Sequence, residues 1–343
     1  MGLFFKNKVI EPKNIIISRT DKIGDLVLSI PSFLMVRKMY PSAKITVLVR
    51  EYNAPIIENF SFIDNVISID KYNNNELFSL IKSLQADTFI ALYSDSLITW
   101  LSLVSGAKFR IGPLSKITSW FIYNYGIKQK RSKSIKNEAE YNLDLVKILN
   151  NDLFNKQSIE TVKIIYNQIN LDNVLEFLKK ENIDKYIVIH PFSGGSAKNL
   201  TLDEYIDLIN TINSKNINEK IVISSSEFDM EDAEYIYNNT ENTVIYQSPS
   251  ILDLAALIDK SEVYFGNSTG PTHIAGNLGK NVVCVYPIKP SLSKTRWGLF
   301  LNDKNTTYIN PDIESEDYSM KVFNKITNED INEMASSIVE KIK

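Results

Sequence analysis

The sequence has few residues of the types that build disulfide and metal frameworks. Its single cysteine, Cys284, excludes an intrachain disulfide and a cysteine metal cluster. No Asp-x-Asp triplet occurs in the 343 residues. No run of apolar residues approaches the roughly 18 residues of a membrane-spanning helix, and only a short apolar stretch precedes Lys6 and Lys8, so we expect no secretion signal and a cytoplasmic chain.

The charge balance excludes a second class of protein. With 38 Lys and Arg against 41 Asp and Glu, the formal net charge is −3. A general nucleic-acid binder needs a broad basic face to displace counterions from phosphates. Any basic site in this chain must therefore be local.

Short apolar runs alternate with amphipathic stretches in both halves of the chain. The runs 15–17, 45–49 and 88–92 are continuous, as in strands buried on both faces of a parallel sheet, and the second half repeats this rhythm. Length alone favours two domains. We therefore predict two doubly wound α/β domains, residues 1–160 and 161–325.

Two details of this organisation are expectations for the structure. We expect a short strand at Val162–Ile165, close to the domain junction. We also expect a final amphipathic helix within residues 326–343, whose apolar stripe could pack back on the N-terminal domain.

Three loops follow predicted strands, where doubly wound folds bind their ligands. In the first, residues 19–25, Asp25 beside Gly24 is either a general base or a helix cap. The second, His190 to Lys198, is a glycine-rich turn that ends in a cation. It suits a pyrophosphate through Lys198 and the donor-loop residues Ser193, Gly194, Gly195 and Ser196, although a plain turn is the alternative.

The third loop, residues 266–273, reads Gly-Asn-Ser-Thr-Gly-Pro-Thr-His. Its hydroxyls and backbone N–H groups could hold a diphosphate at a helix N-terminus. The alternative is that Ser268 or Thr269 caps the helix and that His273 is a satisfied surface residue.

Taken together, the three loops closely resemble the ADP-heptose:lipopolysaccharide heptosyltransferase family, glycosyltransferase family 9. The family's Arg-Thr-Asp-x-Ile-Gly-Asp turn with a following proline matches residues 19–25 and Pro31, and its Gly-Asn-Asp-Thr-Gly-Pro-x-His loop matches residues 266–273. Further matches are Tyr40-Pro41, Arg110-Ile111-Gly112 and His190-Pro191. The resemblance extends from about residue 14 to about residue 290.

The resemblance implies a GT-B enzyme, with two Rossmann-like domains facing a central cleft, that inverts the anomeric centre of a nucleotide-sugar donor, such as ADP-heptose. Asp25 would be the catalytic base. The matching donor-binding positions are Lys198, Glu227, Ser268, Thr269, Gly270 and His273. The acceptor would be a lipopolysaccharide or lipooligosaccharide core, and no cofactor is implied.

Departures from the family pattern leave the substrates open. Ser268 stands where many members have aspartate, and Asn137 where a histidine is common before a Glu-x-x-x-Asn segment, here Glu138 to Asn142. A same-family transferase with another nucleotide sugar or another surface polymer is the alternative, and a non-catalytic sugar-nucleotide binder or an epimerase is a further one.

The remaining expectations concern metal dependence, the residues that bind the acceptor and contact with the membrane. Since no Asp-x-Asp triplet offers metal ligands, we expect no obligatory metal. The basic segment between residues 126 and 136 is either a solvated loop or a contact with anionic groups of a lipid-linked acceptor or of the inner leaflet of the inner membrane. The acceptor-side candidates are Arg19, Lys22, Lys130, Arg131 and Lys133.

Overall fold

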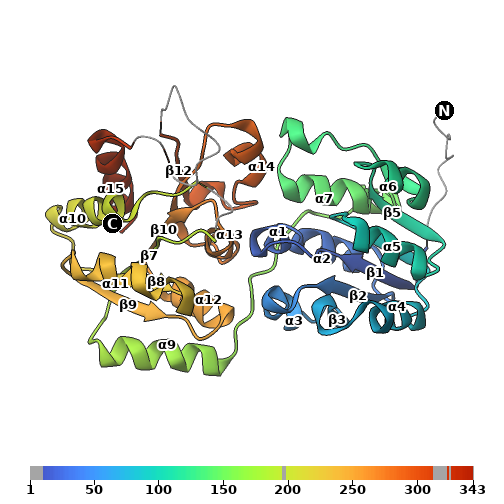
Figure 1. Ribbon diagram of the computed structural model, residues 1–343, viewed down its shortest axis with the longest axis horizontal. Coiled ribbons are helices and arrows are strands. Elements are labelled where there is room, and N and C mark those ends of the chain that lie inside the picture. The colour runs from blue at the N-terminus through green and yellow to red at the C-terminus, as the bar shows by residue number, and fades with distance from the viewer. Residues whose placement is uncertain (1–10, 195–197, 312–322, 324–325, 343) are drawn as a thin grey trace. The chain divides into compact units, whose positions relative to one another are not determined.

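The computed structural model describes residues 11–194, 198–311, 323 and 326–342. Within it the chain divides into two compact units, residues 1–162 and 163–343, where the sequence places the boundary after residue 160. Each unit is an α/β fold (Figure 1). Among the described residues, no helix is long and apolar enough to span a bilayer.

The first unit is built on a six-stranded parallel sheet in the order β3-β2-β1-β4-β5-β6. The strands are β1 (Asn14–Ser18), β2 (Lys44–Val49), β3 (Asn65–Ser68), β4 (Thr88–Ala91), β5 (Phe109–Pro113) and β6 (Tyr125–Ile127). Its helices are α1 (Ile23–Val27), α2 (Ile30–Met39), α3 (Pro55–Glu58), α4 (Asn74–Ser83), α5 (Ser96–Val104), α6 (Ile117–Ile122), α7 (Glu138–Lys147) and α8 (Asn151–Asn155).

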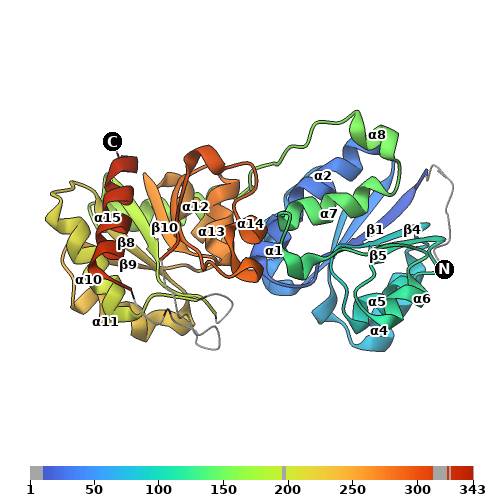
Figure 2. The ribbon, with the colours of Figure 1, turned by 90° about the horizontal axis from the view of Figure 1, so that it is seen from above.

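Helices cover both faces of this sheet. Figure 2 shows α2, α7 and α8 on one side and α4, α5 and α6 on the other. The three-residue turns η1 (Glu51–Asn53), η2 (Ile69–Lys71) and η3 (Arg131–Lys133) lie in its connections. Because both faces are covered, the central strands are rich in apolar residues, and Ile15, Ile16 and Ile17 of β1 are fully buried.

The second unit repeats this architecture with the strand order β12-β11-β10-β7-β8-β9, again all parallel. The strands are β7 (Tyr186–His190), β8 (Lys220–Ser225), β9 (Thr243–Gln247), β10 (Val263–Asn267), β11 (Asn281–Val285) and β12 (Thr306–Ile309). Its helices are α9 (Gln168–Lys180), α10 (Leu202–Ser214), α11 (Met230–Asn238), α12 (Ile251–Lys260), α13 (Gly270–Asn277), α14 (Lys294–Trp297) and α15 (Asn328–Ile342), and its short turns are η4 (Glu227–Asp229), η5 (Pro290–Leu292) and η6 (Asp303–Asn305).

Local sequence explains where several helices begin. At α4 the side chain of Asn73 accepts from the backbone of Asn75 and Glu76, and the Glu76 carboxylate accepts from the Asn73 N–H at 3.0 Å. Thr201 and Glu204 form the same capping box at α10. Such boxes satisfy backbone donors that the first helical turn leaves without partners.

The last helix corrects one expectation. The apolar face of α15, with Ile331, Met334 and Ile338, is buried in the core of the second unit, where it packs against α10. This stripe therefore completes the core of the second unit.

The expected strand at Val162–Ile165 is also wrong. No helix or strand lies between Asn155 and Gln168. The side chain of Asn277 accepts a hydrogen bond from the Ile164 N–H at 2.7 Å, and no neighbouring strand pairs with this segment. The apolar Ile164 is buried as part of a connection. Apolar residues in a short run do not by themselves distinguish a strand from an anchored loop.

Candidate active site and donor loops

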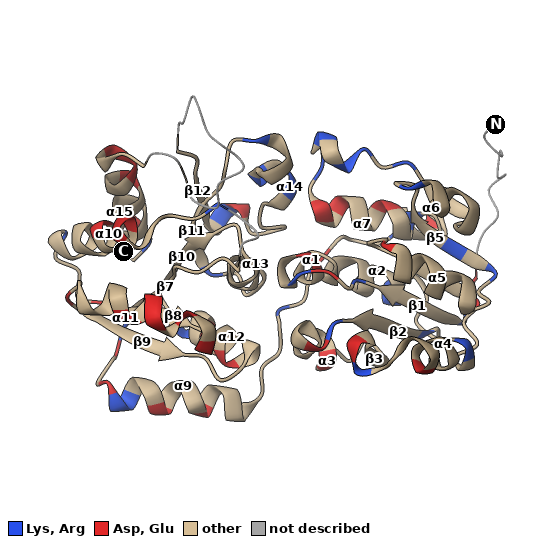
Figure 3. Cartoon of the chain, viewed as in Figure 1, with Lys and Arg blue, Asp and Glu red and all other residues tan. Residues whose placement is uncertain are grey.

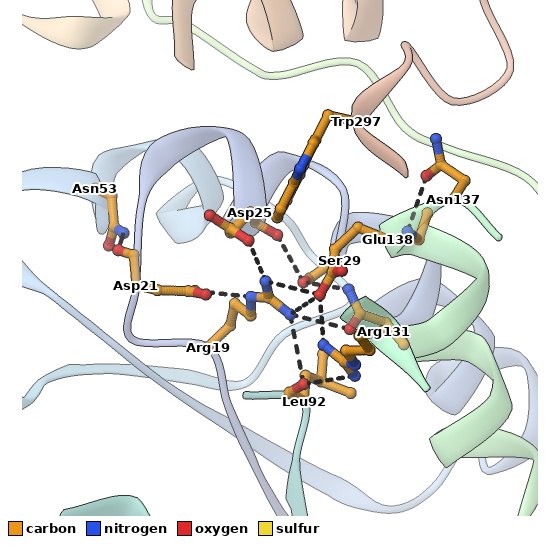
Figure 4. Close-up of polar contacts among 12 residues, drawn as sticks. Arg19, Asp21, Asp25, Ser29, Asn53, Leu92, Arg131, Asn137, Glu138 and Trp297 are labelled. Carbon is orange, nitrogen blue, oxygen red and sulfur yellow. Dashed lines mark hydrogen bonds and ion pairs between the residues drawn. The ribbon is translucent and has the colours of Figure 1, made fainter. Parts of the chain in front are cut away.

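Asp25 lies in α1, directly beyond the carboxyl end of β1. It is the third residue of that helix, whose N-cap position is Lys22 and which has no side-chain cap hydrogen bond. One carboxylate oxygen of Asp25 accepts a hydrogen bond from Nη2 of Arg19 (Figure 4). The helix-cap interpretation of Asp25 is therefore wrong, and the side chain is available for another role.

The second oxygen of Asp25 has no hydrogen bond to any described residue. The Asp25 side chain keeps 12% of its surface exposed, whereas that of Arg19 keeps 1%. Arg19 thus fixes the carboxylate from the protein interior and leaves its other oxygen for a ligand. This is the arrangement that a general base needs.

Arg19 binds several groups at once. Its Nε donates to Asp21 at 2.7 Å, and its Nη1 donates to Asn142 at 3.0 Å and to Glu138 at 3.3 Å. Burial alone would lower the pKa of Arg19, but the carboxylates of Asp21, Asp25 and Glu138 outweigh it and raise that pKa further above its high ordinary value. The guanidinium is therefore permanently charged.

A second arginine completes the buried cluster. Arg131 donates from Nη1 to Glu138 and from Nη2 to the Leu92 carbonyl at 3.0 Å, and its guanidinium carbon lies 5.6 Å from the ring centre of Tyr141. The same Leu92 carbonyl accepts from Arg19 at 3.4 Å. Three carboxylates thus face two guanidinium groups, which leaves an excess of one negative charge when all are ionised.

This cluster corrects two of the acceptor-side candidates. Arg19 is buried beneath Asp21 and Asp25, and the side chain of Arg131 is only 15% exposed because it holds Glu138. The nearby Lys22, Lys130 and Lys133 are exposed. The two arginines pair with carboxylates of the cluster, whereas the three lysines extend into solvent.

Asp21 has a distinct environment. Burial, together with the nearby Asp25 carboxylate, raises the pKa of Asp21 to about 7 although Arg19 opposes the shift. Its backbone carbonyl accepts from Tyr52 Oη at 2.6 Å and from Asn53 Nδ2 at 3.1 Å. The loop after β2 therefore supports the loop after β1.

Strand order explains why these residues meet. β1 and β4 are neighbours in the sheet, and the strands that follow each of them in sequence lie on opposite sides of this pair. The connections after β1 and β4 therefore leave in opposite directions. Ligands of doubly wound folds bind at such switch points. Arg19 follows β1 and Leu92 follows β4, so the cluster occupies this position.

The second unit has its own switch point, between β7 and β10. Lys198 follows β7 and is buried, with 3% exposure, while Ser193 and Gly194 lie on the preceding turn. Gly195 and Ser196 lie outside the described residues. Burial holds the charged end of Lys198 within the loop region.

Asn199 joins this loop to the third one. Its Nδ2 donates to the Pro191 carbonyl at 2.5 Å, and its Oδ1 accepts from Tyr205 Oη at 2.9 Å and from the side chain of Asn267 at the end of β10. The two switch-point loops are therefore cross-linked by one amide. The sequence did not identify Asn199, although it directly follows Lys198.

The third loop leads into α13. Thr269 occupies the N-cap position but makes no side-chain cap hydrogen bond, and Thr272 Oγ1 turns back to the Asn267 carbonyl. A Cβ on Gly266 would lie 2.7 Å from the Tyr264 hydroxyl, so a larger residue here would displace a neighbouring side chain. The capping interpretation of Thr269 is wrong.

His273 and Ser268 complete that loop, and Glu227 lies two strands away from it. His273 is 5% exposed and hence not a surface residue, while Ser268 is half-buried. Glu227 opens η4 just beyond the end of β8 and is exposed. Since β10, β7 and β8 are adjacent and parallel, the predicted donor residues that follow them lie at the carboxyl ends of neighbouring strands in one sheet.

The last residue of β7, His190, is half-buried and contacts β8. His190 Nδ1 lies 3.0 Å from Ser224 Oγ. Burial lowers the pKa of His190 to about 4, so the ring is neutral near pH 7. Among the described residues, no group of three His, Cys, Asp or Glu side chains could hold a metal ion.

Comparison with known proteins agrees with this architecture. Residues 77–321 match the model of glycosyltransferase family 9 (heptosyltransferase). A Haemophilus influenzae protein described as a putative glycosyltransferase is 32% identical over 302 residues, which cover 83% of this chain and 85% of that protein. This chain belongs to glycosyltransferase family 9.

Solved structures show the same fold. The glycosyl transferase family 9 structure from Veillonella parvula superimposes with a TM-score of 0.80 at 15% identity, covering 98% of both chains. The E. coli ADP-heptose lps heptosyltransferase II gives 0.77 at 14% identity, covering 96% of this chain and 98% of that one. The predicted fold class is confirmed: the two doubly wound units are those of a GT-B glycosyltransferase.

The family motifs explain part of the cluster that sequence reasoning left out. Glu138 and Asn142 are the ends of the Glu-x-x-x-Asn segment, and a spacing of four residues places both on one face of α7, toward Arg19. Asn137, where a histidine is common in the family, caps α7 by accepting from the Ala139 N–H at 2.9 Å. The substitution therefore keeps the helix start.

Asp21 yields a prediction for the pH dependence of stability. Its folded pKa, about 7, exceeds its ordinary value of 3.8. The stabilisation from its bound proton is complete below the unfolded pKa and is lost as pH rises through 7. Asp21→Asn should therefore lose less free energy of unfolding than wild type between about pH 5 and about pH 8 in urea titrations. Exposed Asp152→Asn is the control; equal losses in the wild type and Asp21→Asn would contradict the prediction.

Proposed function

We propose that the chain is an inverting glycosyltransferase that moves a heptose from ADP-heptose to the core of a lipopolysaccharide or lipooligosaccharide. The observation that carries the chemical part is Asp25, fixed through one oxygen by buried Arg19 with its second oxygen available. ADP-heptose and lipopolysaccharide appear in the name of the E. coli structural relative. Family membership supports the same substrates here.

Asp25 acts as the base in this proposal. The acceptor hydroxyl attacks the anomeric carbon of the donor, its proton passes to the available oxygen of Asp25, and the bond from that carbon to the diphosphate oxygen breaks. Positive charge develops on the sugar in such a transition state. The Asp25 carboxylate stabilises that charge.

The second unit binds the departing diphosphate in this proposal. Lys198 supplies a cation, and Thr269, Gly270 and His273 surround the uncapped N-terminus of α13, whose backbone N–H groups favour an anion. Ser193 and Gly194 border the same site. In this proposal Glu227, exposed beyond β8, accepts hydrogen bonds from the ribose hydroxyls.

We propose that no metal is obligatory, because Lys198 and the α13 N-terminus supply the positive charge that a diphosphate leaving group needs. Transfer measured with and without a chelator tests this point. Activity that disappears with the chelator and returns with a divalent cation would contradict it.

Ser268 favours a second candidate within the family. A hydroxyl replaces the carboxylate common at this position, so a sugar hydroxyl loses a strong acceptor. The alternative is a different nucleotide sugar or another surface polymer. A panel of ADP-heptose, GDP-sugars and UDP-sugars separates the candidates, since a ligand at about 100 times its Kd adds about 2.7 kcal/mol to the stability of the native state and raises Tm.

We propose that Lys22, Lys130 and Lys133 contact anionic groups of the acceptor, at a cytoplasmic site peripheral to the inner face of the inner membrane. All three are exposed in the unit that carries Asp25. Lys130 and Lys133 flank Arg131, which anchors their loop to Glu138 and Leu92. An anchored loop holds its lysines in place better than a free one does.

Asp25→Asn should fold and bind the donor like wild type but lose about 10²- to 10⁴-fold in kcat, because only the charge and the proton acceptor are removed. Steady-state transfer kinetics and donor-induced Tm shifts measure the two effects. Asp152→Asn, on exposed α8, should transfer normally. Turnover close to wild type in Asp25→Asn would remove Asp25 from the role of base.

Lys198→Ala should raise the donor KM and lower kcat together, with a loss of about 100-fold or more in kcat/KM, because the cation acts on both the bound and the departing diphosphate. The matched control is Lys185→Ala, an exposed lysine just before β7 at the opposite edge of the sheet. Unchanged donor affinity and rate in Lys198→Ala would contradict the diphosphate role.

Lys130→Gln with Lys133→Gln should raise the acceptor KM, by about fivefold for each lysine at low salt, and leave donor binding intact. Arg131 is kept, since its loss would remove one of the two arginines that pair with buried Glu138. Lys179→Gln with Lys180→Gln, exposed on α9, is the control pair. Acceptor kinetics and salt dependence identical to wild type would place acceptor recognition elsewhere.

A further inference from the structure

The chain between Ser96 and Asn137 has a one-sided charge. It contains eight Lys and Arg residues and no Asp or Glu, although acidic residues outnumber basic ones in the whole protein. The segment forms α5, β5, α6 and β6 at one edge of the first sheet. Figure 3 shows blue segments on both sides of α6.

Helix α6 exposes its apolar side. Ile117, Trp120 and Phe121 are 81%, 55% and 84% exposed. Their spacing of three and four residues places them on one side of the helix. The one buried residue of α6 is Ser119, so the usual distribution of a surface helix, with apolar residues inward, is inverted.

The neighbouring helix extends this surface. On α5, which lies beside α6 (Figures 1 and 2), Trp100 is 54% and Leu103 is 43% exposed. The inward residues Ile98 and Leu101 already fill the core against the sheet. The exposed residues are therefore not needed to hold α5 in place. We call Trp100, Leu103, Ile117, Trp120 and Phe121 the α5–α6 aromatic face.

Most cations of this segment have no ion-pair partner among the described residues. Three of the eight are bound within the protein: Arg110 to the carbonyls of Ile122 and Ala107, Arg131 to Glu138 and Lys136 to Asp144. The other five are exposed and form no ion pair with a described residue; they are Lys108, Lys116, Lys128, Lys130 and Lys133. Lys116 directly precedes the exposed Ile117.

These features select one kind of partner. A contiguous exposed aromatic surface marks an interaction site rather than ordinary surface. Pairing with the same face of a second copy would bring lysines against lysines. The surface of a bilayer that contains anionic lipid suits both the aromatic residues and the lysines, because Trp and Phe enter the membrane interface and lysines attract the headgroups.

We propose that the α5–α6 aromatic face docks the enzyme on an anionic bilayer surface. The inference deepens the proposed function, since an enzyme with a lipid-linked acceptor works where that lipid lies, but it rests on the composition of α5 and α6 and not on the identity of the donor. The helices lie on the membrane in this proposal and do not cross it.

Vesicle binding tests the docking surface without any substrate. The full chain should co-sediment with phosphatidylcholine vesicles that contain phosphatidylglycerol, much less with phosphatidylcholine alone, and progressively less as salt rises. Trp120→Ser with Phe121→Ser should lower the partition coefficient by about tenfold or more. Lys108→Gln and Lys116→Gln should each lower it by about fivefold at low salt.

A matched control uses exposed aromatic residues of the second unit. Phe228 and Tyr237 are 97% and 45% exposed, and Phe228→Ser with Tyr237→Ser should bind vesicles like wild type. A chain with Trp100→Phe and Trp297→Phe keeps Trp120 as its one tryptophan. Its emission should shift to the blue on vesicle binding and be quenched by brominated lipid.

Three outcomes would overturn the proposal. They are no binding to anionic vesicles, equal binding by wild type and the Trp120/Phe121 variant, and a wild-type dimer that this variant converts to monomer without a change in vesicle binding. The last result would assign the face to a second copy.

A soluble, lipid-free acceptor glycan separates this proposal from the proposed function. The Trp120/Phe121 variant should keep its kcat/KM on that acceptor while it loses vesicle binding. If the wild type transfers the sugar but does not bind anionic vesicles, only the docking proposal is contradicted. If the wild type binds the vesicles but does not transfer heptose from ADP-heptose, only the proposed function is contradicted.

Discussion

Both units depend on the same constraint: a parallel sheet that is wound outward in two directions from its first strand. β1 lies beside β4 and β7 lies beside β10, so in each unit two loops leave one edge and turn apart. The backbone at that edge ends in helix N-termini, which attract anions. Asp25 lies beside one such edge and Lys198 beside the other.

In the first unit, one arginine converts this topology into a defined geometry. Arg19 connects α1 through Asp25, β4 through the Leu92 carbonyl and α7 through Glu138 and Asn142. A buried guanidinium without carboxylates would be very unfavourable, and three buried carboxylates without it would repel one another. Each group therefore requires the others, and the position of Asp25 follows from the whole cluster.

The second unit uses neutral amides for the same purpose. Asn199 and Asn267 link the two loops at the switch point, so Lys198 and the start of α13 are held together without another charge. A link between amides adds no further charge to these loops. The five exposed lysines between Ser96 and Asn137 are different, because none of them forms an ion pair with a described residue.

The sequence by itself determined the local features: the alternation of buried strands and helices, the loops that carry Asp25, Lys198 and residues 266–273, and the family. These depend on residues close together in the chain, so periodicity and motifs reveal them. Only the tertiary structure decided that Asp25 does not cap its helix, that Arg19 and Arg131 lie inside, that Asn199 links two loops and that α15 completes the second core. Each of these depends on contacts between residues far apart in sequence, such as Arg19 with Glu138 and Asn199 with Asn267, and a single sequence does not encode burial or pairing at that range in any local pattern.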